Sequence, residues 1–162
     1  LLAFSFLDWV YFYMQGSRYK MSLFSFYQRG GYSVCSHIGT LCCSSSEEKI
    51  EIFPIDVEEY TRRRKELLPQ NGVLQEGENL RFLQTMATLY ATDTALLAAR
   101  REGDTLYGLE LLGDPTQASA MVGALGCKKG TLRIPEGDLP FAMYYPLRGD
   151  VLPPSYFGLA FD

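Results

Sequence analysis

Apolar and polar positions alternate at two different periods after residue 46, and these periods predict short strands and amphipathic helices. Residues 49–55 alternate at a period of two, which predicts a strand. Asp56 offers a helix cap, and Glu59 three residues later completes a capping-box pattern. Pro69 ends this helix because proline cannot continue the hydrogen-bond ladder. The inner stripe of the helix is expected to hold Val57, Tyr60, Arg64, Leu67 and Leu68.

A second helix is predicted after the loop at residues 70–78. Asn79 is a suitable cap, and apolar residues recur at helical spacing from Leu80 to Tyr90. The Glu-Gly-Asp sequence at residues 102–104 is then a hairpin turn signal.

Asp114 and Pro115 can open a third helix, and Gly126 can end it. The elements predicted in this part of the chain are a hairpin over residues 94–101 and 105–112, a helix over 116–125, and strands over 130–135 and 141–147.

A different pattern occupies residues 26–39, FYQRGGYSVCSHIG. Phe26 and Tyr27 end an apolar, aromatic run, and the Gly30-Gly31 pair can adopt positive φ angles. The residues that follow alternate at a period of two. The pattern predicts a helix end, a glycine turn and a strand. By itself it describes a helix-to-strand corner with an aromatic plug, since Phe-Tyr pairs usually fill cores.

Composition is typical of a globular chain long enough for one substantial core, with 162 residues, 47% of them hydrophobic and 21% charged. The net charge of −4 argues against nucleic acid as a partner, because phosphate binding needs a basic face. The basic run at residues 62–65 falls in the last turns of its helix, where cations interact favourably with the helix dipole.

The apolar run at residues 1–14 is too short to span a membrane. The absence of an initial Met suggests a truncated, mispredicted or non-native amino end.

Four cysteines without a CxxC pair suit a reduced, cytoplasmic protein. A metal site from Cys35, His37, Cys42 and Cys43 is the alternative, but the spacing fits no zinc knuckle and adjacent ligands are awkward for tetrahedral coordination. We therefore expect half-buried thiols and no metal. A hydrolase could use only His37, the single histidine, and the chain has no GxSxG motif.

The sequence FYQRGGY at residues 26–32 resembles the FYxxxGF element of the GNAT acetyltransferases (GCN5-related N-acetyltransferases), with Tyr32 in place of the usual Phe. In that family the element joins the last helix to the next strand. The resemblance implies that Tyr27 protonates the thiolate of CoA after an amine attacks acetyl-CoA. A phenol suits this role because its pKa of about 10 is near that of an alkyl thiol.

The order of predicted elements from residue 49 also resembles the GNAT topology, with one central element missing. The chain is therefore similar to the C-terminal part of a tandem GNAT protein. Residues 1–45 would be the tail of an upstream domain, and residues 46–162 a divergent second copy. The implied fold is α/β, with a mixed, mostly antiparallel sheet flanked by helices. The implied reaction is acetyl transfer from acetyl-CoA to a small-molecule or peptide amine, with no membrane partner.

Two features decide whether the second copy could be active. Glu110 lies among leucines and is the candidate base by resemblance, although strand alternation would also explain it as an outward-facing residue. GNAT domains bind pyrophosphate through a Q/R-x-x-G-x-G/A loop at a helix start, which this chain lacks. Asp114 brings a negative charge to that place and Pro115 removes a donor. We therefore expect a silent unit that covers the first domain, shapes the acceptor pocket or supports homo-oligomerisation. The alternative is a non-catalytic α/β interaction or oligomerisation domain.

Overall fold

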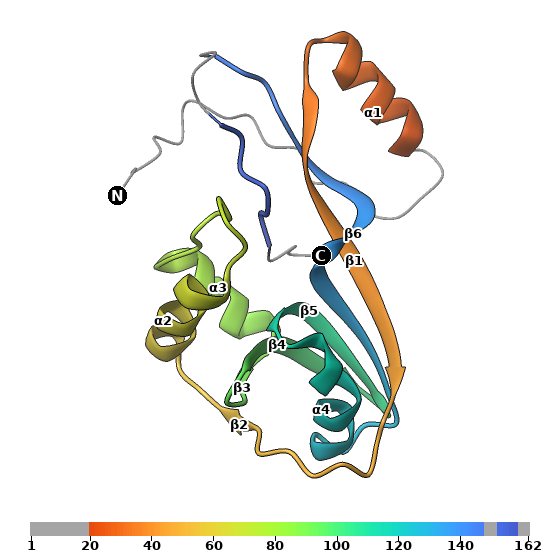
Figure 1. Ribbon diagram of the computed structural model, residues 1–162, viewed down its shortest axis with the longest axis vertical. Coiled ribbons are helices and arrows are strands. Elements are labelled where there is room, and N and C mark those ends of the chain that lie inside the picture. Colours follow the sequence, from red (N-terminus) through yellow and green to blue (C-terminus); the bar gives the residue numbers. More distant parts are fainter. Residues whose placement is uncertain (1–19, 148–151, 159–162) are drawn as a thin grey trace.

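A six-stranded sheet forms the centre of the molecule, and its strands are ordered β1-β6-β5-β4-β3-β2 (Figure 1). The computed structural model describes residues 20–147 and 152–158. The strands are β1 (Ser33–Ser44), β2 (Phe53–Pro54), β3 (Thr88–Ala91), β4 (Ala95–Glu102), β5 (Thr105–Gly113) and β6 (Lys129–Tyr144). The described helices are α1 (Lys20–Arg29), α2 (Val57–Leu67), α3 (Glu78–Met86), the 3₁₀ helix η1 (Pro115–Gln117) and α4 (Ala118–Ala124).

The sheet is mixed and mostly antiparallel. Neighbouring strands run antiparallel except β5 and β6, which are parallel. Parallel neighbours need a crossover connection, and α4 supplies it. These observations confirm the predicted fold class, an α/β structure with a mixed, mostly antiparallel central sheet flanked by helices.

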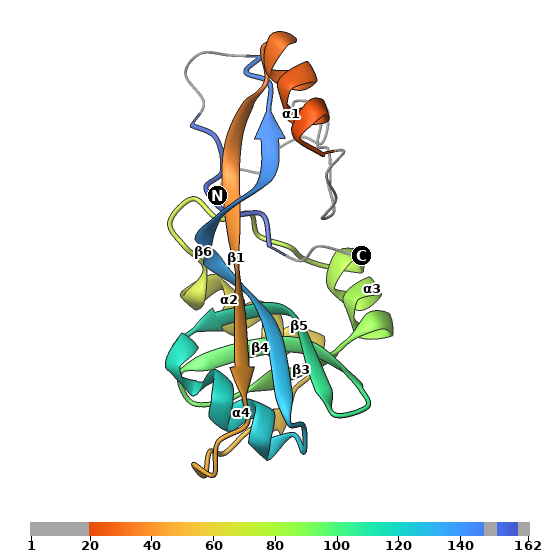
Figure 2. The same cartoon turned by 90° about the vertical axis from the view of Figure 1, so that its right-hand side faces the viewer.

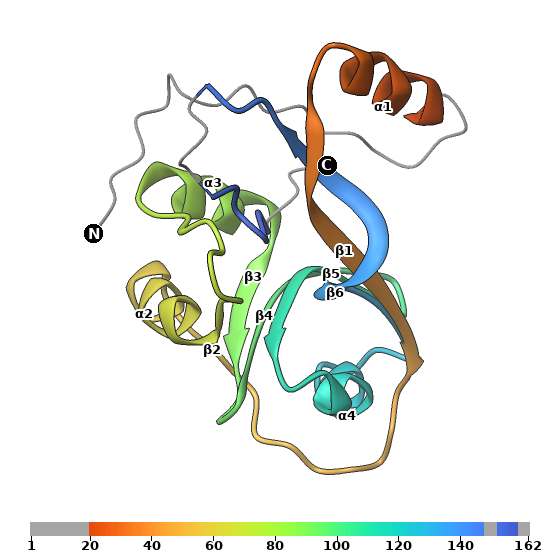
Figure 3. The ribbon, with the colours of Figure 1, turned by 45° about the horizontal axis from the view of Figure 1, so that its top comes forward.

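Two apolar clusters cover the two faces of the sheet, because successive strand residues point to opposite sides. On β4, Leu96 and Ala98 join the cluster beneath α2 and α3, whereas Leu97 and Ala99 join the cluster beneath α4. Figure 3 shows α2 and α3 on one side of β3 and β4, and α4 on the other. Such strands, buried on both faces, read as continuous apolar runs.

Strands β1 and β6 form a long ribbon that extends beyond the other strands and carries α1 at its far end (Figure 2). The register shifts where Ile38 pairs with Leu139 and Gly39 pairs with Ile134, so residues 135–138 bulge out of the ladder. The sheet thus contains residues from both sides of the boundary predicted near residue 45. The assignment of residues 1–45 to an upstream domain stays a prediction.

Strand β3 is an element that the sequence pattern concealed. The predicted helix was expected to continue to Tyr90, but α3 ends at Met86 and Tyr90 lies in β3. The predicted cap was also wrong, because Gly77 precedes the first turn while Asn79 donates a hydrogen bond to Gln75 (2.9 Å).

Other boundaries were predicted with mixed success. Asp56 caps α2 as predicted, accepting a hydrogen bond from the Glu59 amide (2.8 Å). The β4–β5 hairpin also has its predicted turn. The strand predicted over residues 49–55 shrinks to β2, and the two strands predicted over residues 130–147 form the single strand β6.

The apolar run at residues 1–14 lies outside the described residues. Within residues 20–147 and 152–158, no helix has the length and apolar character needed to cross a membrane.

Candidate functional site

The FYQRGGY segment forms the predicted corner between helix and strand. Helix α1 ends at Arg29, and Gly31 has a φ of 90°, which non-glycine residues rarely adopt. The Tyr27 carbonyl accepts hydrogen bonds from the amides of Gly30 (2.9 Å) and Tyr32 (3.1 Å). These bonds close the helix and turn the chain into β1, so the local geometry follows from the glycine pair.

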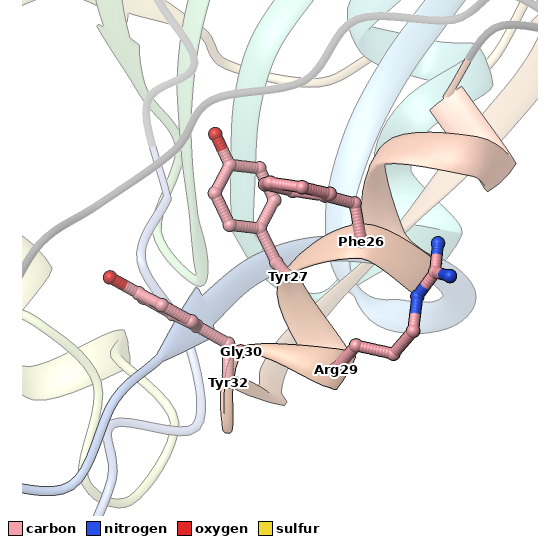
Figure 4. Close-up of a pocket in the computed structure, with 5 residues that line it drawn as sticks. All are labelled: Phe26, Tyr27, Arg29, Gly30 and Tyr32. Atoms are coloured by element: carbon pink, nitrogen blue, oxygen red, sulfur yellow. The ribbon is translucent and has the colours of Figure 1, made fainter.

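Aromatic rings gather at this corner around an open hollow of about 480 Å³. Its lining residues are Phe26, Tyr27, Arg29, Gly30 and Tyr32. The Tyr27 and Tyr32 rings meet edge to face with centroids 5.5 Å apart. Figure 4 shows both tyrosines on one side of the turn and Arg29 pointing away from them. The corner therefore presents the Tyr27 hydroxyl from a half-buried aromatic surface.

Glu110, the other predicted catalytic residue, faces α2 because β5 contains a bulge. Ala98 pairs with Glu110 while Ala99 pairs with Gly108, so Leu109 has no partner of its own on β4. The bulge breaks the alternation and places Leu109 and Glu110 on the same side of the sheet. Glu110 is fully buried, so the interpretation of it as an outward-facing residue is wrong.

The Glu110 carboxylate is the centre of a buried polar cluster. Arg64 donates from Nε to Oε2 (2.9 Å) and from Nη2 to Oε1 (2.9 Å), which makes a bidentate ion pair. Tyr60 donates to Oε2 (2.8 Å) and Tyr156 to Oε1 (3.0 Å). Arg64 also donates from Nη1 to the Val73 carbonyl (2.9 Å). Side chains from α2, β5 and the C-terminal segment thus meet at one carboxylate.

Burial and charge shape the acid–base behaviour of this cluster. Burial raises the pKa of Tyr60 and of Tyr156 well above 10, and the negative charge of Glu110 adds to the effect. For Arg64, burial opposes the charged form, but the attraction of Glu110 outweighs it and raises the pKa. At neutral pH the two phenols are therefore neutral and the guanidinium is charged. Glu110 could accept a proton from an amine only if one of these bonds broke.

The start of the helical connection after β5 is occupied by its own residues. Asp114 accepts hydrogen bonds at Oδ1 from the Thr116 amide (2.9 Å) and hydroxyl (2.6 Å), and these bonds lower its pKa. The Gln117 side chain accepts from Thr92 (2.7 Å) and donates to Thr94 (2.6 Å). A negatively charged carboxylate therefore caps the start of the connection between β5 and β6.

The two predicted catalytic residues lie in different parts of the molecule. Tyr27 belongs to α1, at the far end of the β1–β6 ribbon, whereas Glu110 lies in the centre of the sheet beneath α2 (Figure 1). The structure does not gather them into one site.

Sequence reasoning missed the partners of Glu110. Arg64 was placed both on the inner stripe of its helix and in a basic run that favours the helix dipole. Its position on the stripe was the informative signal, since it is fully buried. The neighbouring cations do not act alone on the dipole either, because Arg62 and Arg63 both bind Glu59. Tyr156 gave no signal beyond its aromatic surroundings.

Comparisons with known proteins find similarity only at the level of structure. No family model matches the sequence, and no curated protein matches it. A GCN5-related N-acetyltransferase from Kribbella flavida matches with a TM-score of 0.53 and 9% identity, over 81% of this chain and 37% of that protein. A conserved protein of unknown function from Enterococcus faecalis V583, described as a probable N-acyltransferase, matches with a TM-score of 0.46 and 14% identity, over 74% of this chain and 42% of that protein.

The chain thus spans less than half the length of either protein. The likeness to the Kribbella protein concerns the fold, since 9% identity carries no residue-level equivalence. The chain has a GNAT-like α/β fold with a six-stranded, mostly antiparallel sheet.

Proposed function

We propose that this chain is the C-terminal part of a tandem GNAT-type N-acetyltransferase. In this proposal Tyr27 serves the domain that precedes it, and the GNAT-like unit from residue 46 onward does not bind acetyl-CoA. Acetyl-CoA is the co-substrate of the whole protein, and a small-molecule or peptide amine is the acceptor.

The observation that carries the proposal is the start of the connection between β5 and β6. Acetyl-CoA is polyanionic, and a helix start binds phosphate through free backbone amides and the positive end of its dipole. Here the Asp114 carboxylate already accepts from the Thr116 amide, and Pro115 has no amide hydrogen to offer. A pyrophosphate would meet a negative charge, the Thr116 amide is already bonded and Pro115 offers no donor, so the second unit is unsuited to acetyl-CoA.

In this proposal Tyr27 is the general acid of the upstream domain. The amine nitrogen attacks the thioester carbonyl, a C–N bond forms, and the C–S bond breaks. The departing thiolate takes the Tyr27 hydroxyl proton, and the proton of the amine passes to solvent or to a base. Support comes from the resemblance of FYQRGGY and from the open aromatic hollow beside Tyr27. If the second unit were active instead, Glu110 would be its candidate base and would first have to lose a hydrogen bond from Arg64, Tyr60 or Tyr156.

Isothermal titration of acetyl-CoA tests the proposal, with this chain compared with a version extended through its upstream coding sequence. We expect only the extended version to bind. Acetyl-CoA binding by this chain alone would overturn the assignment of a silent second unit.

In the extended protein, Tyr27→Phe should lower kcat by roughly 10²–10⁴-fold, because it removes a general acid. Tyr32→Phe is the matched control, since it removes a phenol from the same hollow and should leave kcat within about twofold. Equal losses in the two variants, or no loss in Tyr27→Phe, would contradict the role of Tyr27.

A non-catalytic interaction or oligomerisation domain is the second candidate, and exposed apolar side chains favour it. Phe26 on α1 is 63% exposed, Leu139 on β6 is 56% exposed, and Leu147 after β6 is 60% exposed. Exposed apolar side chains such as these are candidates for contact with a partner. Sedimentation equilibrium would support this candidate if the chain self-associates and Leu139→Ser weakens the association.

A further inference from the structure

Strand β1 is the outermost strand on one side of the sheet, and β6 is its only partner strand among the described residues. The shifts in its register with β6 all lie before Gly39, so residues 39–44 form a regular stretch of edge. Figure 1 shows this stretch with β6 on its inner side and no described helix or strand beyond it. A further strand could therefore pair along it.

The hydrogen bonds to β6 show which main-chain groups of this edge face outward. The Ser45 amide donates to the Lys128 carbonyl (2.9 Å), so these two residues form a hydrogen-bonded pair. In an antiparallel ladder, such pairs alternate with pairs that do not bond each other. The odd-numbered residues of the stretch therefore bond to β6, whereas the amides and carbonyls of Thr40, Cys42 and Ser44 point away from it. The side chains of these three residues are exposed.

The two edges of the sheet differ in how they are protected. Strand β2, at the opposite edge, has only two residues, and one of them is Pro54, which has no amide hydrogen. Strand β1 has 12 residues and contains no proline and no Lys, Arg, Asp or Glu. Natural sheets usually protect an edge by short strands, proline or charge, because an unpaired edge associates with other strands. The β1 edge lacks these protections, so it is suited to pairing.

The side chains of residues 39–44 fit a second copy of the same strand. In an antiparallel pair about a two-fold axis at Cys42, Cys42 meets Cys42 of the second copy and Thr40 meets Ser44. All three outward-facing residues then pair, and no like charges lie opposite each other. Leu41 and Cys43 pack in the cluster beneath α4 and hold the strand in place from its other face.

The geometry favours a closed pair over an open chain of copies. A two-fold pairing uses the same β1 edge of both copies, and β2 at the opposite edge is too short to continue the sheet. Helix α1, through which the chain enters β1, lies at the other end of the β1–β6 ribbon (Figure 2). The stretch at residues 39–44 is thus distant from the point where the preceding chain joins the ribbon.

We propose that residues 39–44 of β1 form a dimer interface, in which two copies of this chain pair antiparallel about an axis at Cys42 and join their six-stranded sheets into one. This inference does not depend on acetyl transfer, so the result of the acetyl-CoA titration has no bearing on it.

Amide hydrogen exchange, followed by NMR at increasing protein concentration, tests the pairing within a single strand. We expect the amides of Thr40, Cys42 and Ser44 to exchange at least ~10-fold more slowly in the dimer, because pairing gives each of them a carbonyl acceptor. The amides of Leu41 and Cys43 are the internal control, since they bond to β6 in the monomer and in the dimer. Protection of the first three amides that does not depend on concentration would overturn the proposal and assign the edge to another segment of the same chain.

Charge placed at the axis tests whether the partner is a second copy. Cys42→Lys and Cys42→Glu each bring two like charges together, so each should raise the dimer Kd at least ~5-fold in sedimentation equilibrium. A mixture of the two variants should dimerise at least as tightly as the wild type, because opposite charges then meet. Thr131→Lys is the matched control, since it adds the same charge on β6 beside Cys42, one strand away from the axis. Leu139→Ser should leave this Kd unchanged, because Leu139 pairs with Ile38, outside the stretch at residues 39–44.

A disulfide reports the register if the charge variants do not fold. Two Cα atoms of a hydrogen-bonded antiparallel pair lie about 5.5 Å apart, which is within the range of a disulfide. Diamide, which accepts the two hydrogens of the thiols, should therefore link Cys42 to Cys42 of the second copy. Thr40→Cys combined with Cys42→Ser is the control, since its two thiols would be about 13 Å apart along the strands and should not link.

Three outcomes would overturn the inference. The wild-type chain could remain a monomer at all concentrations, with fast exchange at Thr40, Cys42 and Ser44. The Cys42 charge variants could weaken association no more than Thr131→Lys does, which would place the contact elsewhere. The two thiol variants could cross-link equally, which would show that the register is not centred on Cys42.

Discussion

At the residue scale, the Glu110–Arg64 pair shows how one carboxylate can join three parts of a chain. Its partners come from α2 and from residues 152–158, and each oxygen accepts two hydrogen bonds. A buried ion pair contributes little net stability compared with apolar residues, because desolvation offsets the attraction. Its loss on one side is nevertheless costly, since the remaining charge stays buried without a partner.

Glu110→Gln should lower the free energy of unfolding by about 3–5 kcal/mol, because Arg64 would stay buried without a counter-charge. Glu59→Gln is the control, since it removes a carboxylate from the ion pairs of α2 with Arg62 and Arg63, which are not fully buried. Urea unfolding of the two variants measures the difference. Similar midpoints for both would show that the buried pair has no special weight.

The two buried phenols predict how stability depends on alkaline pH. Burial and then Glu110 raise the pKa of Tyr60 and Tyr156 in the folded protein above the unfolded value of about 10. Their contribution is therefore fully present below pH 10 and is lost as the pH rises above it. Urea unfolding at a series of pH values from about 8 to 11 should show falling stability, with a smaller slope in Tyr156→Phe. An unchanged slope in Tyr156→Phe would contradict the raised pKa of Tyr156. Tyr145→Phe is the control, because Tyr145 is exposed and its loss should leave the slope unchanged.

At the element scale, close backbone approach decides the course of the β1–β6 ribbon. A Cβ at Gly39 would overlap the Glu136 carbonyl oxygen, and a Cβ at Gly137 would overlap the Gly39 backbone. The bulge at residues 135–138 therefore depends on glycine on both strands. This is why β6 continues through a stretch that the sequence pattern divided into two strands.

Gly39→Ala should destabilise the ribbon by about 1–3 kcal/mol, because the added methyl has no space and the backbone must shift. Gly30→Ala is the matched change, since its nearest atom would be 3.2 Å away and its φ is not positive. Thermal or urea unfolding, followed by circular dichroism, compares the two. Equal stability would show that the ribbon can move apart at this point.

Particular residues explain which elements could be predicted. The hairpin was predictable because its turn and its alternation are both local. Strand β3 was concealed because Tyr90 lies at a helical spacing from Leu80. Its pairing with Leu97 of β4 and Pro54 of β2 makes it a strand residue. The burial of Glu110 depends on a bulge in β5, and the local sequence pattern does not predict this bulge.

At the scale of the whole molecule, one sheet contains β1, which lies before residue 45, and the strands that follow it. Strand β1 pairs with β6 along its length, and β6 pairs with β5 over Thr105–Gly108. The assignment of residues 1–45 to an upstream domain stays a prediction.

We expect a single cooperative unfolding transition for this chain, because β1 and the central strands share one sheet. Far-ultraviolet circular dichroism and tyrosine fluorescence should give coincident urea curves. Two separate transitions would show that the segment before residue 45 folds independently, as a strict domain boundary there would require.

Features that depend on short-range interactions could be predicted from the amino-acid sequence. The Asp56 cap, the turn between β4 and β5, the glycine corner after Tyr27 and the charge at Asp114 all depend on neighbours within a few residues. The α/β class followed from the order of these local elements.

The other features could not be predicted, because they depend on contacts between residues far apart in the chain. Arg64 and Tyr156 reach Glu110 from 46 positions before and after it, and no period in the sequence encodes such a meeting. Alternation predicts that a strand has two faces. It does not predict on which face a carboxylate lies when a bulge shifts the register. The burial of Glu110, the union of β1 with β6 and the docking of residues 152–158 were therefore set by packing.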